Sequence, residues 1–62
     1  MNVSVEIQAT CDGHRCTGTG DGSPIKKAVA DAMRDLADCM ELHGCDDEAA
    51  ELREAADEWD PQ

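Results

Sequence analysis

Apolar and polar residues alternate strictly over residues 3–9, and this pattern constrains the fold more than any other feature of the chain. A period of two residues is typical of a strand with one buried face. The dipeptide Asp12-Gly13 follows closely, and it favours the two-residue type I′ turn of a β-hairpin. The sequence therefore predicts an antiparallel hairpin over residues 2–20.

Two helices are predicted after the hairpin. Ser23-Pro24 offers a cap residue and a proline at the first helical position. The apolar residues that follow have helical spacing: Ile25, Val29, Ala32, Leu36, Cys39 and His43, flanked by Met33 and Met40. Gly44 is the left-handed residue predicted to end this helix, over residues 24–43, and an acidic helix follows over residues 47–59. The predicted fold is α+β, one small domain over residues 1–62, with a two-stranded antiparallel hairpin packed on two helices (ββαα).

The metal-capable residues fall into two short clusters, residues 11–16 and 39–45. The predicted turn pairs Cys11 with His14 and Ala9 with Cys16, which puts the first cluster on the apolar face of the hairpin. The first helix must run back along the hairpin, and at ~1.5 Å per residue the second cluster begins about 22 Å from its start. The clusters should therefore meet at one end of the fold. The candidate metal ligands are Cys11, Cys16, Cys39 and Cys45, with His14 or His43 as substitutes.

Three states of these cysteines are open. One structural zinc would take four thiolate or imidazole ligands, and the hairpin-plus-helix plan resembles that of ββα zinc fingers. Free thiols would instead behave as small buried hydrophobes. The third state is one or two disulfides, such as Cys11–Cys16 or a bridge from hairpin to helix. Apart from zinc, no cofactor is indicated, and the sequence shows no orienting group or oxyanion cradle for an enzyme that uses a thiol.

The composition predicts a thin core. The chain has no Phe or Tyr, Trp59 is its one aromatic residue, and many apolar residues are alanines, which bury little area each. A chain of 62 residues with such a core usually needs a staple, a metal or a second copy, so we expect a homodimer. The N-terminus resembles no signal peptide, and no stretch is long enough to span a membrane. The prediction is a cytoplasmic protein without membrane contact.

Negative charge is concentrated at the C-terminal end. The formal net charge is -10, and residues 46–60 hold eight acids against Arg53 alone. Binding to a phosphate backbone depends on clustered Lys and Arg, so nucleic acid is not an expected partner. A row of carboxylates on a rigid helix could instead imitate a nucleic-acid backbone or steer association with a basic protein surface. The candidate partner-binding residues are Glu51, Glu54, Asp57, Glu58 and Trp59.

Lys26 and Lys27 stand in the first turn of the first helix, where the helix dipole favours acids. Next to free backbone N–H groups they are candidate anion-binding residues. The alternative is that they pair with Asp21 or with acids of the second helix. The stretch from Gly18 to Ala32, a Gly-rich turn into a lysine-started and Ala-rich helix, resembles the second half of a double-stranded-RNA-binding domain. That resemblance implies phosphate contacts by the two lysines, although the family's first helix and third strand have no counterpart in this chain.

These observations predict a small acidic interaction protein without enzymatic activity. It would act as an inhibitor or adaptor, binding a host or partner protein through the acidic helix. The Ala-rich helix after a Gly-Thr-Gly hairpin is similar in style to small proteins of actinobacteria and their phages, and a phage-encoded protein is one expectation from this resemblance. The alternative function is a zinc-stabilised module that binds nucleic acid through Lys26, Lys27, Arg15 and Arg34. A thiol enzyme or redox protein is the third hypothesis.

Overall fold

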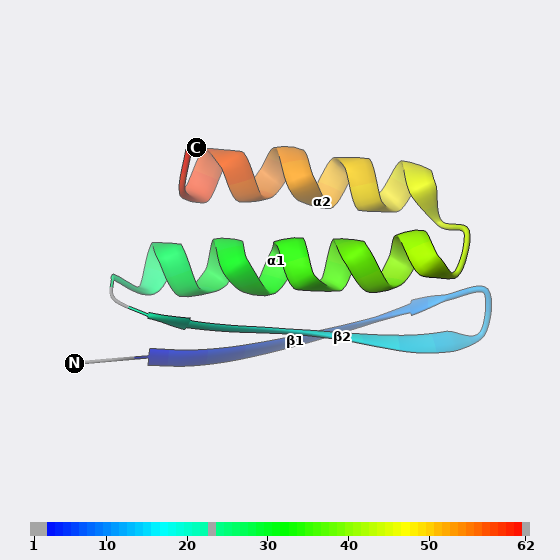
Figure 1. The fold of residues 1–62 in the computed structure, drawn as a ribbon, viewed down its shortest axis with the longest axis horizontal. Coiled ribbons are helices and arrows are strands. Elements are labelled where there is room, and N and C mark those ends of the chain that lie inside the picture. The colour runs from blue at the N-terminus through cyan, green and yellow to red at the C-terminus, as the bar shows by residue number, and fades with distance from the viewer. Residues whose placement is uncertain (1–2, 23, 62) are drawn as a thin grey trace.

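The computed structural model describes residues 3–22 and 24–61, and it has the predicted ββαα arrangement. The elements in order are β1 (Val3–Cys11), β2 (His14–Gly22), α1 (Ile25–Leu42) and α2 (Asp46–Trp59). The strands form a two-stranded antiparallel sheet, and α1 lies between this hairpin and α2 (Figure 1). The molecule is elongated, with extents of 36 × 19 × 12 Å. Within the described ranges no helix is long and apolar enough to cross a membrane.

The hairpin has the register predicted from the Asp-Gly turn. Cys11 pairs with His14 and Ala9 with Cys16, and the pairing continues to the far end of both strands. The two turn residues have positive φ values, 49° and 80°, as a type I′ turn requires. The second strand is longer than predicted, because it ends at Gly22 instead of residue 20. The turn and register predictions are therefore confirmed.

Two glycines of β2 let α1 approach the sheet closely. A Cβ atom added to Gly18 would overlap the carbonyl oxygen of Ala32 and lie 2.6 Å from the backbone nitrogen of Leu36. A Cβ added to Gly20 would overlap the carbonyl oxygen of Ala28 and lie 2.6 Å from the nitrogen of Ala32. Two strand residues rise about 6.7 Å and four helical residues about 6 Å, so the glycines match successive turns of α1. The backbone of α1 therefore packs directly on the backbone of β2.

This close approach decides which side chains of α1 lie against β2. The buried residues are mostly small: Ala28, Ala30, Ala32, Leu36, Ala37 and Met40. The predicted apolar stripe was right for Ala32 and Leu36. It was wrong for Ile25, whose side chain is 55% exposed, and His43 is exposed as well. Only small side chains fit where two backbones are in contact, so Ala28 and Ala32 occupy the interface with β2.

The start of α1 lies one residue later than predicted. Pro24 is the N-cap, in an extended conformation, and Ile25 is the first helical residue. The carbonyl oxygen of Pro24 accepts hydrogen bonds from the backbone N–H groups of Lys27 (3.0 Å) and Ala28 (3.4 Å). The predicted cap residue, Ser23, lies outside the described residues.

The end of α1 is a Schellman motif. Gly44 has a φ of 87°, which confirms its predicted left-handed conformation. The N–H of Cys45 donates to the carbonyl oxygen of Met40 (2.9 Å), and the N–H of Gly44 donates to that of Glu41 (3.1 Å). Cys45 also packs against the core cluster that contains Met40. The motif fixes the direction in which α2 leaves the first helix.

Arg34 joins the two helices at the other end of α2. Its side chain on α1 is 21% exposed, and its Nη2 donates to the Oδ1 of Asp57 (3.0 Å) and to the carbonyl oxygen of Asp60 (2.8 Å). The second bond satisfies a carbonyl just beyond the last turn of α2, where helical acceptors lack partners. Arg34 thus holds the C-terminal end of α2 against α1.

We expect Arg34→Ala to lower the free energy of unfolding by about 2 kcal/mol, because it removes charge-assisted hydrogen bonds from a half-buried position. Urea unfolding followed by circular dichroism measures the change. Arg34→Lys keeps the charge but loses the two-pronged geometry, so it should restore only part of the loss. The control is Arg15→Ala, at an exposed strand position. Equal stability of the Arg34→Ala and Arg15→Ala variants would contradict this role.

Candidate functional site

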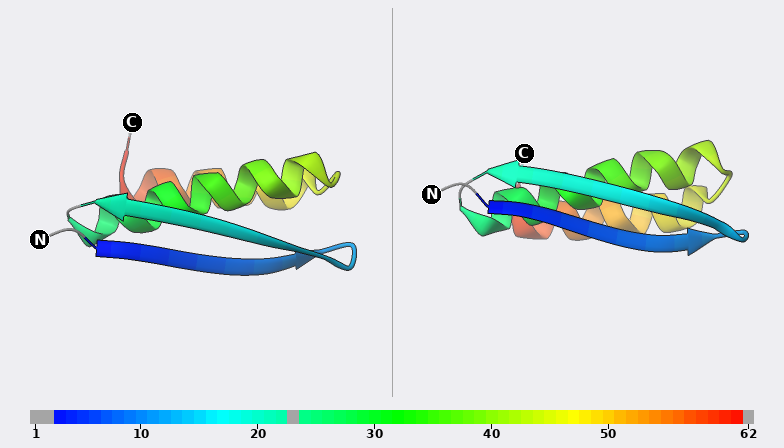
Figure 2. Two further views of the ribbon diagram at one scale, coloured as in Figure 1. Left: turned by 60° about the horizontal axis from the view of Figure 1, so that its bottom comes forward. Right: turned by 90° about the horizontal axis from the view of Figure 1, so that it is seen from below.

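The hairpin turn and the α1–α2 connection lie at the same end of the molecule (Figure 1). Figure 2 shows α1 running back along the hairpin, with the second strand beside it. The two clusters of cysteine and histidine therefore meet, as the topology predicted. Every second residue of β2 faces α1. Gly20 and Gly18 are therefore followed on the same face by Cys16 and His14.

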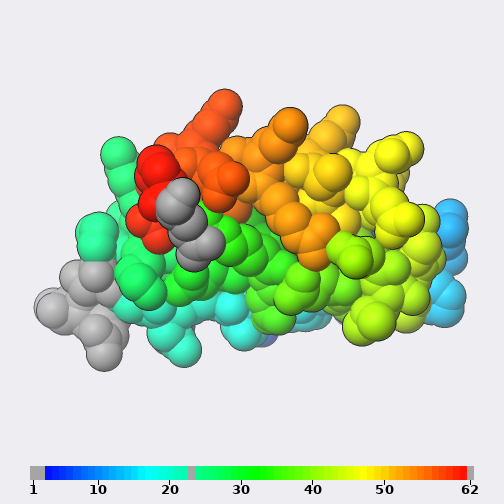
Figure 3. Space-filling view, turned by 45° about the horizontal axis from the view of Figure 1, so that its top comes forward, coloured from blue at the N-terminus to red at the C-terminus, as the bar shows by residue number. Residues whose placement is uncertain are grey.

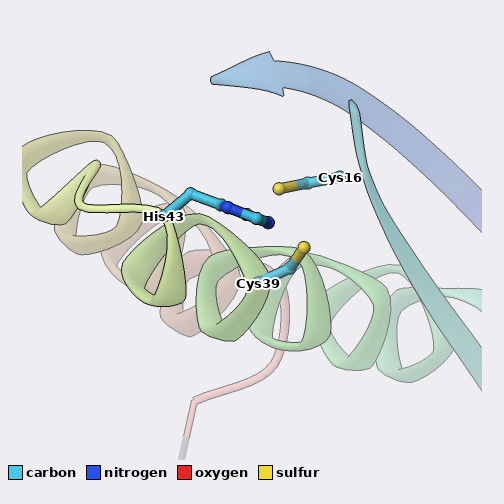
Figure 4. A group of neighbouring side chains, drawn as sticks. All are labelled: Cys16, Cys39 and His43. Carbon is cyan, nitrogen blue, oxygen red and sulfur yellow. The ribbon is translucent and has the colours of Figure 1, made fainter. Parts of the chain in front are cut away.

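Cys16, Cys39 and His43 form a compact group of potential metal ligands. Each offers one ligand atom, and these atoms all lie within 4.8 Å of one another. Cys39 lies in the last turn of α1 and His43 is the C-cap residue four positions later, one residue beyond the end of the helix at Leu42, and Cys16 faces them from β2 (Figure 4). Cys16 is fully buried, Cys39 is half-buried and His43 is exposed. The group is therefore anchored in the core and open to solvent at its histidine.

The two thiols of this group interact with each other. A hydrogen bond with Cys39 raises the pKa of Cys16 to about 11, and burial and the charge of Cys39 act in the same direction. In the metal-free protein the Cys16 thiol therefore stays protonated at neutral pH. A protonated thiol is a weak nucleophile, and a metal ion that binds its sulfur must displace the proton into solvent.

The other two cysteines have a different arrangement. Cys11, at the end of β1, forms a disulfide with Cys45, at the start of α2, and their Cα atoms are 6.4 Å apart. A carboxylate oxygen of Asp12 lies within 4.8 Å of both sulfur atoms, but the disulfide leaves no thiolate there. The predicted set of four cysteines is thus divided between two neighbouring groups, and the structure does not bring all four sulfur atoms together.

His14 lies beside the first group. Its ring stacks on that of His43, with ring centroids 4.5 Å apart and an angle of 12° between the planes. His14 and Cys16 are two residues apart and lie on the same face of β2, and His14 is exposed. Both histidines of the predicted clusters therefore stand at the open side of the Cys16–Cys39 pair.

A second feature is an apolar groove between β1 and α2. Its volume is about 280 Å³, and it is lined by Ala9, Leu36, Met40, Glu48, Glu51, Leu52 and Ala55. The groove exists because α1 lies mainly over β2, while α2 packs on α1 and leaves the inner face of β1 half-exposed. Glu48 and Glu51, both exposed, form its acidic rim. A binding surface with apolar walls and an acidic edge results.

The predicted partner-binding residues divide between two places on α2, the helix coloured yellow to red along the upper part of Figure 3. Glu51 borders the groove. Glu58 and Trp59 instead border a hollow near Lys26, and the Trp59 side chain is 44% exposed. Glu54 is exposed, and Asp57 pairs with Arg34. Sequence reasoning missed Glu48 and the small groove residues, because nothing in the sequence showed that α2 would leave the face of β1 open.

The basic residues do not form one surface. Lys27 pairs with Asp31 at 3.3 Å, and Arg34 is held by Asp57 at 3.0 Å. Arg15 lies near the hairpin turn, whereas Lys26 lies in the first turn of α1, at the opposite end of the molecule (Figure 1). The predicted anion-binding pair is therefore divided, with Lys27 engaged along its own helix and Lys26 beside Trp59.

The chain thus presents two candidates for a functional site, a group of cysteines and histidines at one end and an acidic, partly apolar surface along α2. Each arises from a different part of the packing, the first from the contact of β2 with α1 and the second from the gap between β1 and α2. Comparisons with protein-family models, with curated proteins and with solved structures found no match to this chain.

Proposed function

We propose that this chain is an interaction protein that binds a basic, amphipathic segment of a partner protein in the groove between β1 and α2. The observation that carries the proposal is the combination of apolar walls with an acidic rim, Glu48 and Glu51. A helix that presents aliphatic residues on one face and lysines or arginines at its edges complements such a surface. The protein would then act as an inhibitor or adaptor without catalysis of its own.

The charge of α2 supports a basic partner. Among residues 3–22 and 24–61, Arg34 and Arg53 form ion pairs with Asp31, Asp38, Glu41, Asp57 and Asp60. None of the ion pairs in these ranges involves Glu48, Glu51, Glu54 or Glu58, so the outer face of α2 keeps its negative charge. Such a field increases the association rate with a positively charged surface.

A second copy of the chain is a poorer occupant of the groove. Each copy has a formal net charge of -10, and a symmetric contact would bring the Glu48 and Glu51 rims of two molecules together. Like charges that face each other across an interface weaken binding by on the order of several kcal/mol. The homodimer expected from the thin core is therefore not the function proposed for this surface.

We expect Glu48→Lys/Glu51→Lys to weaken binding of a model amphipathic peptide of leucine and lysine at least about tenfold, because the rim then repels the peptide's lysines. Isothermal titration calorimetry measures the affinity. The matched control is Glu6→Lys/Asp21→Lys, which makes the same change in charge on the outer face of the hairpin. Equal weakening by both variants would mean that only total charge matters and would remove the groove from the proposal.

The acidic residues farther along α2 are tested separately. Glu54→Lys/Glu58→Lys reverses the same number of charges beyond the groove rim. A loss as large as that of the Glu48/Glu51 variant would place the contact along the whole helix, including Trp59, as the sequence alone suggested. No binding of the peptide by the unmodified protein, in low salt, would reject the proposal as a whole.

The second candidate function was a zinc-stabilised module that binds nucleic acid. Of this candidate we keep the zinc site and not the binding of nucleic acid. The group of Cys16, Cys39 and His43 offers thiol and imidazole donors, which zinc binds, and these atoms lie within 4.8 Å of one another, so we infer one structural zinc at this end of the fold. The scattered basic residues offer no surface that follows a phosphate backbone. Zinc would here stabilise the scaffold that carries the groove.

A further inference from the structure

The two histidines extend the Cys16–Cys39 pair into a set of four. Cys16 and His14 are two residues apart on the inner face of β2, while Cys39 lies in α1 and His43, four residues later, is the C-cap of that helix. The strand thus contributes one thiol and one imidazole, and so does the C-terminal end of α1 with its cap residue. The thiols lie toward the core and the imidazoles toward the open end, where their ring centroids are 4.5 Å apart.

We propose that Cys16, Cys39, His43 and His14 are the four ligands of a zinc ion, in place of the four cysteines. This inference rests on the structural zinc proposed above and assigns its ligands. Three of the ligand atoms already lie within 4.8 Å of one another, which leaves room for an ion between them after small side-chain movements. Zinc is the metal of choice for two thiolates and two imidazoles in a closed tetrahedron.

His14 completes the tetrahedron by turning its ring. In the structure its ring stacks nearly parallel on that of His43, and its nitrogen atoms are not among the donor atoms that lie within 4.8 Å of one another. Its side chain is exposed, so rotation about its own bonds meets little resistance. The backbone of β2 need not move, because His14 is already on the same face as Cys16.

The charge balance suits the location. Both thiols release their protons on binding, and two thiolates with two neutral imidazoles cancel the two positive charges of the ion. A neutral complex can remain next to the buried Cys16 without the cost of an isolated buried charge. Four cysteines would instead leave two negative charges in a protein that is already strongly acidic.

The disulfide explains why Cys11 and Cys45 are not ligands. A disulfide sulfur has no thiolate to offer, and these two cysteines are bonded to each other. Of the cysteines, Cys16 and Cys39 are the two free thiols. The staple and the metal site would then act side by side at the same end of the molecule.

Titration of the protein with Co²⁺, followed by displacement with Zn²⁺, tests the ligand set, because tetrahedral cobalt–thiolate complexes have characteristic absorption bands. The disulfide stays intact, and the free thiols are kept reduced by preparation without oxygen. We expect one equivalent of metal with the spectrum of a two-thiolate site. Cys39→Ser should abolish that spectrum, and His14→Ala should weaken zinc binding at least about tenfold, as loss of a metal-site group does.

The matched control for His14→Ala is Arg15→Ala, the exposed neighbour on the other face of β2, which should bind zinc unchanged. Circular dichroism of each variant without metal confirms that it folds. A Cys11→Ser/Cys45→Ser variant should retain the two-thiolate spectrum. Loss of binding in that variant together with unchanged binding in His14→Ala would overturn this ligand set while leaving the structural zinc in place. Failure of the unmodified protein to bind either metal would overturn both.

Discussion

Replacing Gly18 or Gly20 by alanine is expected to unfold the domain or to bring it close to unfolding. The added Cβ would overlap the backbone of α1, at the carbonyl oxygens of Ala32 and Ala28 respectively. Backbone atoms cannot rotate away as a flexible side chain can, so helix and strand must separate along the interface. Overpacking of a core costs about 1–3 kcal/mol and sometimes more. Because these overlaps are with backbone atoms, we expect a loss of stability at or above the upper end of that range. A small domain with a thin core has little stability in reserve.

The measurement is thermal unfolding of each variant, followed by circular dichroism. Thr17→Ala is the matched control, because Thr17 is an exposed neighbour on the outer face of the same strand. It should change the melting temperature only slightly. If Gly18→Ala and Gly20→Ala melted at the same temperature as Thr17→Ala, then α1 would not pack on β2 as closely as the structure shows.

The hairpin could be predicted in detail because its determinants are local. Alternation over residues 3–9 identifies the buried face, and Asp12-Gly13 selects a turn that allows one register. The Schellman end of α1 at Gly44 was readable for the same reason, since a glycine after an amphipathic stretch marks the left-handed position. Both features depend on a few neighbouring residues and require no knowledge of tertiary packing.

The buried face of α1 could not be predicted in the same way. A search for apolar periodicity weights large residues, and it assigned Ile25 to the core, where the structure leaves it 55% exposed. The deciding contacts are those of two glycines on a strand with the backbone of a helix at Ala28 and Ala32. Such contacts contribute little to a hydrophobicity pattern because glycine and alanine have small side chains. The signal available in the sequence was the spacing Gly18-x-Gly20 opposite a run of alanines.

The candidate site was predictable in place but not in composition. Topology alone brought the clusters of residues 11–16 and 39–45 to one end, and the structure agrees. Spacing could not tell which of the four cysteines would face each other, because sequence leaves disulfide connectivity open. The division into a Cys11–Cys45 bridge and a Cys16–Cys39 pair depends on which strand lies under α1. The groove beside α2 also depends on which strand lies under α1, so it could not be predicted from the sequence either.

The state of Cys11 and Cys45 is linked to the compartment of the protein. A reducing cytoplasm, the location predicted from the sequence, keeps most thiols free, whereas the structure pairs these two in a disulfide. Intact mass of protein isolated under conditions that block thiol exchange distinguishes the two, because the disulfide removes two hydrogen atoms. The consequence for stability follows from where the bridge connects the chain.

Loss of the Cys11–Cys45 disulfide is expected to lower the free energy of unfolding by about 4 kcal/mol. The bridge joins the end of the hairpin to the start of α2 across a sequence separation of 34 residues, and the chain-entropy estimate for a loop of this length gives that magnitude. The unfolded chain without the bridge has many more conformations, while the folded contacts around the buried Cys11 are largely kept. Urea unfolding of Cys11→Ser/Cys45→Ser, compared with the unmodified oxidised protein, measures the difference.

Both samples contain a metal chelator, so that zinc at the neighbouring Cys16–Cys39 pair adds nothing to either stability. Cys39→Ser is the control for the loss of a thiol, because Cys39 is free and half-buried. Reduction of the unmodified protein should reproduce the effect of the double serine variant, since both open the same loop. Unfolding midpoints that coincide in the oxidised, reduced and double-serine proteins would show that the thin core needs no covalent staple, and the stability of the fold would then rest on the glycine-mediated contact of β2 with α1.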